Sequence, residues 1–339
     1  WESSTWIGGQ VPTAGDDVVI DGPVIIQGGD ACRHLRVNAA GSIQNIVGRF
    51  FTETLAINGD LVNSGSILVV GNHQLGIDVK GDVDSDGLWS PTFTSLSGSE
   101  EQQVSLGGGA HFEGTWTHDN TSGTISAGSD LSFRNGSLDL HARTLVLAGV
   151  TLTLDEKVHF TNGVLAGDYT IDGLTRTLWG GVTLEGTITN TGTLENHPGG
   201  FNPEFVSVRG TLINRGTIRD SSAGRLFLVL DGSAINEGTW TNSETRFIGT
   251  VDQGLSNADG HPFGGNWRAA DSVVVVAGGP LAFDAATIDM GRGQIQMMGN
   301  GLTLVGGSNL ARATIDAPDL YMAGGATIGP DALLTEDVT

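Results

Sequence analysis

The chain has 339 residues, and its 38 acidic residues against 16 basic ones set a formal net charge of −22. This excess of acids disfavours nucleic acid and anionic membrane surfaces as partners, since both are bound through clustered Lys and Arg. The sequence contains no apolar run of about 18 residues and therefore predicts no membrane-spanning segment. The single cysteine, Cys32, excludes an intrachain disulfide and is expected to lie buried as a small apolar residue.

From the N-terminus onward, short apolar alternations broken by Gly and Asn predict strands of about three to six residues. Examples are "TLVLAGVTLTL" (Thr144–Leu154) and "VSVRGTLINRGTI" (Val206–Ile218). No sustained 3.6-residue apolar pattern predicts a helix. The sequence therefore indicates an all-β protein.

Five nonapeptides share Gly in the first and seventh places, apolar residues in the third and ninth, and Asn (Ser in one) in the fifth. They are "GDLVNSGSI" (Gly59–Ile67), "GDVDSDGLW" (Gly81–Trp89), "GTITNTGTL" (Gly186–Leu194), "GTLINRGTI" (Gly210–Ile218) and "GSAINEGTW" (Gly232–Trp240). The first two begin 22 residues apart, and the last three are offset by 24 and then 22. A weaker echo, "HFEGTW" (His111–Trp116), matches "INEGTW" (Ile235–Trp240).

A period of about 22 residues suits one coil of a parallel β-solenoid, whose coils hydrogen-bond to one another and share a core. We therefore predict a single-stranded parallel β-helix of roughly 15 coils. The third and ninth places are expected to point inward, and the glycines to occupy tight corners. The Asn column is predicted to lie in a turn that tolerates left-handed backbone and to form a ladder between coils. Its members are Asn63, Asn190, Asn214 and Asn236.

A possible calcium site lies in "DVDSDG", where Asp82, Asp84 and Asp86 precede a glycine as in the first half of a calcium loop. The twelfth place of that loop would be Phe93 instead of the bidentate acid that the full motif needs. With Asp60 from the preceding coil, the three carboxylates could still hold calcium completed by water. A solvated acidic corner is the favoured alternative.

Tryptophans are candidates for sugar binding, because flat aromatic faces suit sugar rings. Trp89, Trp116 and Trp240 fall at inward places of the repeat and are expected in the core. Trp179 and Trp267 are undecided between the core and a ligand-binding role, and they are the two candidate ligand-binding residues.

A second polar group, His111, His118 and Asp119 in "HFEGTWTHDN", could bind zinc or act as acid and base. The spacing matches no zinc motif, so ordinary surface residues are the favoured interpretation. No catalytic residue is assigned, and calcium is the one cofactor considered.

The repeats resemble the β-helical shafts of filamentous-haemagglutinin-type bacterial surface proteins. The opening "WIGGQVPTAGDDVVIDG" (Trp6–Gly22) resembles the start of G8-like secreted bacterial modules, and Ser99–Trp116 is similar to a repeat of large secreted bacterial proteins. The resemblance implies a right-handed helix, an N-terminal cap over 1–22 that contains Trp6, and a shaft with loop insertions over 23–339. It also implies a structural role for Asp16–Asp17, the best-looking carboxylate doublet, in the turn before the first strand.

The expected function is that of an extracellular or cell-surface stalk or adhesion module, non-enzymatic, within a larger exported bacterial protein with flanking domains. Its expected partners are glycans or other cell-surface components. The runner-up is a carbohydrate-active β-helix enzyme, either a polysaccharide lyase or a glycoside hydrolase. A third alternative is a self-assembling surface-layer component joined by calcium at acidic corners.

Overall fold

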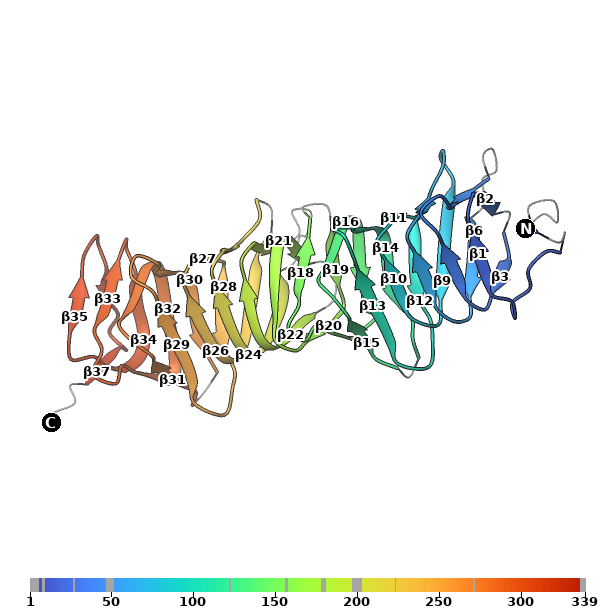
Figure 1. Cartoon of the computed structure of the whole chain (residues 1–339). Helices are drawn as coiled ribbons and strands as arrows, with labels where there is room; N and C mark the ends of the chain where they lie inside the picture. Colours follow the sequence, from blue (N-terminus) through green and yellow to red (C-terminus); the bar gives the residue numbers. More distant parts are fainter. Residues whose placement is uncertain are drawn as a thin grey trace. The chain divides into compact units, whose positions relative to one another are not determined.

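A computed structural model describes residues 6–7, 10–26, 28–46, 52–121, 123–155, 158–177, 181–196, 203–222, 224–270 and 272–335 (Figure 1). Every regular element in these ranges is a β-strand, which confirms the all-β prediction. The strands form two compact units, Trp1–Ala166 and Gly167–Thr339. None of the described residues forms a helix that could span a membrane.

The first unit contains β1 (Val18–Ile20), β2 (Pro23–Ile26), β3 (Asp30–Cys32), β4 (Leu35–Val37), β5 (Ser42–Asn45), β6 (Thr52–Ile57), β7 (Leu61–Asn63), β8 (Ser66–Leu68), β9 (Gln74–Val79), β10 (Val83–Ser85), β11 (Leu88–Ser90), β12 (Phe93–Leu96), β13 (Gln102–Leu106), β14 (Phe112–His118), β15 (Ile125–Ala127), β16 (Leu131–Asp139), β17 (Thr144–Val146), β18 (Thr151–Leu154), β19 (His159–Thr161) and β20 (Gly163–Ala166). The second contains β21 (Tyr169–Thr177), β22 (Val182–Asn190), β23 (Thr193–Asn196), β24 (Glu204–Asn214), β25 (Thr217–Arg219), β26 (Leu226–Asn236), β27 (Thr239–Thr241), β28 (Glu244–Phe247), β29 (Gln253–Asn257), β30 (Phe263–Ala269), β31 (Val274–Ala277), β32 (Leu281–Gln296), β33 (Leu302–Val305), β34 (Asn309–Asp316), β35 (Leu320–Met322), β36 (Thr327–Ile328) and β37 (Leu333–Thr335).

Each coil supplies strands to parallel sheets, in which every strand pairs with its counterparts in the neighbouring coils. In the first unit, β1, β4, β7, β10 and β13 follow one another in one sheet. A second sheet runs through β2, β5, β8 and β11, and a third through β3, β6, β9 and β12. The two units together contain about 13 turns, roughly 22 residues apart. The predicted period is confirmed, and the turns are slightly fewer than predicted.

The repeat positions expected inside the solenoid are all in the core, at most 2% exposed. They are Leu61, Ile67, Val83, Trp89, Ile188, Leu194, Leu212, Ile218, Ala234 and Trp240. Cys32 is also fully buried, as predicted, and burial raises the pKa of its thiol to about 12. The interior is thus held together by stacks of apolar side chains, one layer per coil.

The side-chain amides of the Asn column form the predicted ladder. Asn190 Nδ2 donates to Asn214 Oδ1 (2.8 Å), and Asn214 Nδ2 donates to Asn236 Oδ1 (2.9 Å). Asn63 Nδ2 donates instead to Ser85 Oγ of the next coil (3.0 Å). The predicted position in a turn is wrong, because each of these four Asn is the buried last residue of a strand and none has positive φ. The amide is needed because it donates and accepts at once.

Some corners require glycine because the backbones of successive coils approach closely. A Cβ at Gly87 would lie 2.2 Å from the carbonyl oxygen of Gly65, one coil earlier. At Gly210, where φ is +134°, a Cβ would lie 2.2 Å from the oxygen of Gly186. The repeated Gly of the nonapeptides therefore reflects both tight contact and, in the second unit, left-handed backbone.

A buried aromatic cluster occurs in each unit. In the first, the Trp89 ring lies 5.3 Å from Phe112 and 5.5 Å from Trp116. Its Nε1 donates to Thr94 Oγ1 (3.1 Å). These contacts fill the inward side of β11, β12 and β14.

The second unit repeats this arrangement with the same residue types. The Trp240 ring lies 5.5 Å from Phe263 and 5.6 Å from Trp267, and its Nε1 donates to Thr245 Oγ1 at 3.1 Å. The equivalent of Trp116 is therefore Trp267.

The sequence match that put Trp116 at the same repeat place as Trp240 is wrong. Trp89 pairs with Phe112, so the inward place of the next coil holds Phe112 rather than Trp116. Trp116 instead pairs with Thr94 in the neighbouring sheet. Its expected burial is nevertheless confirmed, at 2% exposure.

Candidate functional sites

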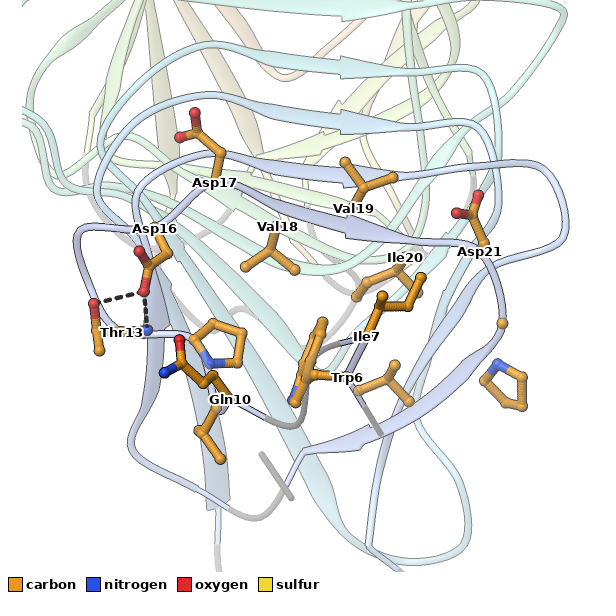
Figure 2. Close-up of a pocket in the computed structure, with 15 residues that line it drawn as sticks. Trp6, Ile7, Gln10, Thr13, Asp16, Asp17, Val18, Val19, Ile20 and Asp21 are labelled. Carbon is orange, nitrogen blue, oxygen red and sulfur yellow. Dashed lines mark hydrogen bonds between the residues drawn. The ribbon is translucent and has the colours of Figure 1, made fainter. Parts of the chain in front are cut away.

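A surface hollow of about 840 Å³ lies at the N-terminal end and is lined by Trp6, Ile7 and the strands β1 and β2 (Figure 2). Trp6 is half-buried, whereas Ile7 is fully exposed. The first strand, Val18–Ile20, already pairs with β4, so the solenoid begins inside the segment expected to be a cap.

The acidic doublet beside this hollow is occupied by local bonds. Asp16 Oδ2 accepts the backbone N–H of Thr13 (2.7 Å) and then its hydroxyl (2.8 Å), and these bonds lower the pKa of Asp16. Asp17 accepts two hydrogen bonds from Arg33, both 2.7 Å, which lower the pKa of Asp17. This geometry supports a structural role in the turn before β1.

Two of the candidate calcium ligands accept backbone hydrogen bonds from the next coil. Asp60 Oδ1 accepts the N–H of Asp82 (3.0 Å), and Asp82 Oδ1 accepts the N–H of Gln103 (2.7 Å). His34 Nδ1 accepts the N–H of Asp60 in the same column (2.9 Å). These side chains therefore connect successive coils.

The remaining candidate calcium ligands, Asp84 and Asp86, are exposed. Within the described ranges, no group of three or more His, Cys, Asp or Glu side chains is arranged to hold a metal ion. The four predicted carboxylates are thus not brought together as a ligand set, and calcium binding there stays a prediction.

The two candidate sugar-binding tryptophans have different outcomes. Trp267 is only 1% exposed and packs against Phe247, Phe263 and Phe283 at 4.7–5.8 Å between ring centroids. The suggestion that it binds a ligand is corrected, because a ring buried on both faces has no surface for a sugar. Trp179 lies outside the described residues.

The alternative of a His111–His118–Asp119 site is not supported, and the favoured interpretation as surface residues is wrong for His118. His118 is 1% exposed, and burial, followed by the charge of Arg143, lowers its pKa. His111 Nε2 instead lies 3.7 Å from Glu113 Oε1. Only Asp119 belongs to a surface cluster.

That cluster, here the Asp119–His141 cluster, joins residues from successive coils of the first unit. His141 Nδ1 lies 2.7 Å from Asp119 Oδ1, and His141 Nε2 lies 3.3 Å from Asp139 Oδ2. Asp119 Oδ2 accepts the hydroxyls of Thr117 (2.7 Å) and Ser95 (2.8 Å). Burial alone would raise the pKa of Asp119, but the hydrogen bonds from Thr117, Ser95 and His141 outweigh it and hold that pKa below its usual value.

A second cluster lies on the outer face of the sheet formed by β24, β26, β28, β30, β32 and β34 in the second unit (Figure 1, yellow to red). Arg246 pairs with Arg268 in the next coil, Arg268 with Asp289, and Asp289 with Arg312. We call Arg246, Arg268 and Arg312 the arginine column. They line an open hollow of about 390 Å³.

Two carboxylates hold the arginine column in place. Glu244 Oε1 accepts from Arg246 Nη2 (2.7 Å), and its Oε2 lies 3.4 Å from Arg268 Nε. Asp289 accepts two hydrogen bonds from Arg312, at 2.8 and 2.7 Å, which lower the pKa of Asp289. The three guanidinium groups are therefore positioned before any ligand arrives.

Exposed aromatic surface lies beside the arginine column. Phe227 pairs with Glu244, and Val229, two residues on and hence on the same face, pairs with Arg246. Phe205 is 46% exposed and meets Phe227 edge-on at 5.3 Å. Phe205 is exposed and Phe227 half-buried, so this aromatic pair offers the kind of surface for a sugar ring that Trp267 does not.

Sequence reasoning missed both clusters. Asp119 and His141 are 22 residues apart, as are Arg246 and Arg268, so the repeat period was a usable signal. Arg268 and Asp289 are 21 apart, whereas Asp289 and Arg312 are 23 apart with a register shift between them. Arg312 is 44 residues from Arg268, which is two steps of 22, but these steps pass through Met290, whereas the residue that pairs with both arginines is Asp289.

Comparisons with known proteins add no family: a scan against protein-family models, a search of curated proteins and a search of solved structures each found no match.

Proposed function

We propose that the chain is an extracellular or cell-surface stalk or adhesion module of a larger exported bacterial protein. It contacts glycans or other surface components through its outward strand faces. The proposal includes no reaction and assigns no catalytic residue. The repeat motifs and the resemblance they carry support the extracellular setting.

The observation that carries the proposal is the contrast between a packed interior and an open outer surface. The cavity beside His118 has a volume of only about 20 Å³, the space of roughly one water molecule. The hollows of about 840 and 390 Å³ both open to solvent. A ligand larger than water would not fit the cavity beside His118, whereas on the outer faces strands from many coils offer repeated contacts.

Affinity electrophoresis through gels that contain neutral or acidic polysaccharides tests this function, with each gel assayed for new reducing ends. We expect slower migration in at least one polysaccharide gel and no new ends. Unchanged migration in every gel would contradict glycan adhesion. New reducing ends would contradict the non-enzymatic assignment.

A carbohydrate-active enzyme is the second candidate, because two carboxylates, Asp119 and Asp139, flank His141 on one outer face. Such a group could exchange protons with a bound sugar. An Asp119→Asn variant should then abolish any release of reducing ends while leaving the thermal midpoint within a few degrees.

A further inference from the structure

The arginine column presents positive charge outward, although two carboxylates, Glu244 and Asp289, offset most of the charge of its three arginines. The side chains of Arg246, Arg268 and Arg312 are 44%, 51% and 55% exposed, whereas those of Glu244 and Asp289 are 9% and 23% exposed. The carboxylates thus lie beneath the guanidinium groups. An approaching ligand meets the guanidinium layer first, even on a chain whose net charge is −22.

The spacing along the column follows from the solenoid itself. Neighbouring strands lie about 4.8 Å apart, so Arg246 and Arg268 are separated by about 5 Å and Arg268 and Arg312 by about 10 Å along the stack. One sugar residue of a polysaccharide chain has a length close to one such step. A chain that lies across the strands therefore meets an arginine at nearly every residue.

The aromatic pair lies on the same face of the sheet, on the two strands that precede the arginine column. Phe205 and Phe227 belong to β24 and β26, the two strands that precede β28 in the sheet. An exposed aromatic ring packs against the apolar face of a sugar, while a planar guanidinium group binds carboxylate or sulfate through two parallel hydrogen bonds. The face offers both contacts side by side, with the aromatic pair two residues along the strand from the line of the arginine column.

We propose that this face, made of the arginine column with Phe205 and Phe227, binds an acidic polysaccharide lengthwise across the strands. The guanidinium groups bind its carboxylate or sulfate groups, and the phenyl rings contact its sugar rings. Glu244 and Asp289 act as positioning residues. This inference rests on the proposed function, because it names the ligand class of one outward face.

The test is affinity electrophoresis of the full chain in gels that contain polygalacturonate, dextran sulfate or neutral dextran. We expect retardation by an acidic polymer, weaker at high salt, and none by neutral dextran. The carboxylated and sulfated gels distinguish which anionic group is bound. Retardation by neutral dextran alone would overturn the acidic assignment and leave glycan adhesion standing.

Single variants then locate the binding. Arg246→Gln and Arg312→Gln should each weaken binding roughly tenfold, the usual size of one lost charge-assisted contact. Arg268→Lys keeps the charge beside Glu244 but loses the planar fork, so it should fold and still bind more weakly. Phe205→Ala should weaken binding without changing its salt dependence.

The matched control is Arg215→Gln, which removes the same charge from an exposed ion pair with Glu237 (2.7 Å). We expect this variant to bind within about twofold of the parent chain, since general charge effects are spread over the surface. Equal weakening by Arg215→Gln and Arg246→Gln would overturn the site. Full binding by all column variants would do the same. Lack of binding by the parent chain in all three gels would overturn this inference and count against glycan adhesion.

Discussion

Replacement of Asn214 by alanine should destabilise the second unit strongly, because this side chain occupies the centre of the Asn ladder. It is fully buried, and its amide makes three hydrogen bonds. Asn214 Oδ1 accepts from Asn190 (2.8 Å), and Nδ2 donates to Asn236 Oδ1 (2.9 Å) and to the carbonyl oxygen of Thr239 (2.8 Å).

The size of this destabilisation depends on the hydrogen bonds that the neighbouring Asn side chains keep when Asn214 is replaced. Asn190 Nδ2 keeps a 3.3 Å bond to the oxygen of Thr217, and Asn236 Oδ1 keeps the N–H of Gly238 at 3.3 Å. With a net contribution of about 1 kcal/mol per hydrogen bond, the loss of three bonds lowers the free energy of unfolding by about 3 kcal/mol.

Urea unfolding followed by tryptophan fluorescence measures this loss, since Trp240 is buried in the same coil stack. The control is Asn266→Ala, which removes one bond from an exposed Asn to the oxygen of Ser243 (2.9 Å) and should cost less than about 1 kcal/mol. A loss below about 1 kcal/mol for Asn214→Ala, or equal losses for both variants, would refute the ladder as a major source of stability.

Three further predictions concern buried groups and tight corners. Because burial holds the pKa of His118 below the usual value of 6.5, the unfolded chain takes up a proton first as pH falls; stability is therefore full above pH 6.5 and falls below it. We expect this fall to be smaller in His118→Leu, by up to about 1.4 kcal/mol per pH unit, when urea unfolding is compared at pH 7.5 and 5.5. The thiol of Cys32, with a pKa of about 12, should react with iodoacetamide at pH 8 only after unfolding, and rapid labelling of the folded chain would contradict its burial. Gly216→Ala would place a Cβ 2.0 Å from the oxygen of Gly192 and should destabilise by more than about 2 kcal/mol, whereas Gly279→Ala, with open space around it, should change stability little; similar melting temperatures for both variants would disprove the corner argument.

Much of the fold could be predicted from the sequence because each coil repeats the same local demands. Leu61, Val83 and Leu212 occupy one repeat place and are all buried, and the Asn ladder forms where the fifth place recurs. Where a residue must face inward, or a glycine must contact the preceding coil, the same residue type recurs at the same place in each repeat. Such a repeat can be recognised from the sequence alone.

The candidate sites could not be predicted in the same way, because outward residue types are free to vary from coil to coil, and a separation of one period does not by itself show which of them form a site. The burial of Trp267 depends on its pairing with Thr245 in β28 and Ile288 in β32, and the register between β30 and β32 shifts between Phe263 and Gly265. Asp119 and His141 meet only because two neighbouring coils are close in length.

The amino-acid sequence by itself thus determined the solenoid, its period and its inward stacks, since these depend on apolar burial within each coil. Only the tertiary structure decided which outward side chains become neighbours across coils. Asp289, for example, lies between Arg268 and Arg312 at offsets of 21 and 23 residues, through strand pairings that contain a register shift. Such contacts between coils depend on the number of residues in every intervening strand and loop, and no local sequence pattern predicts that total exactly.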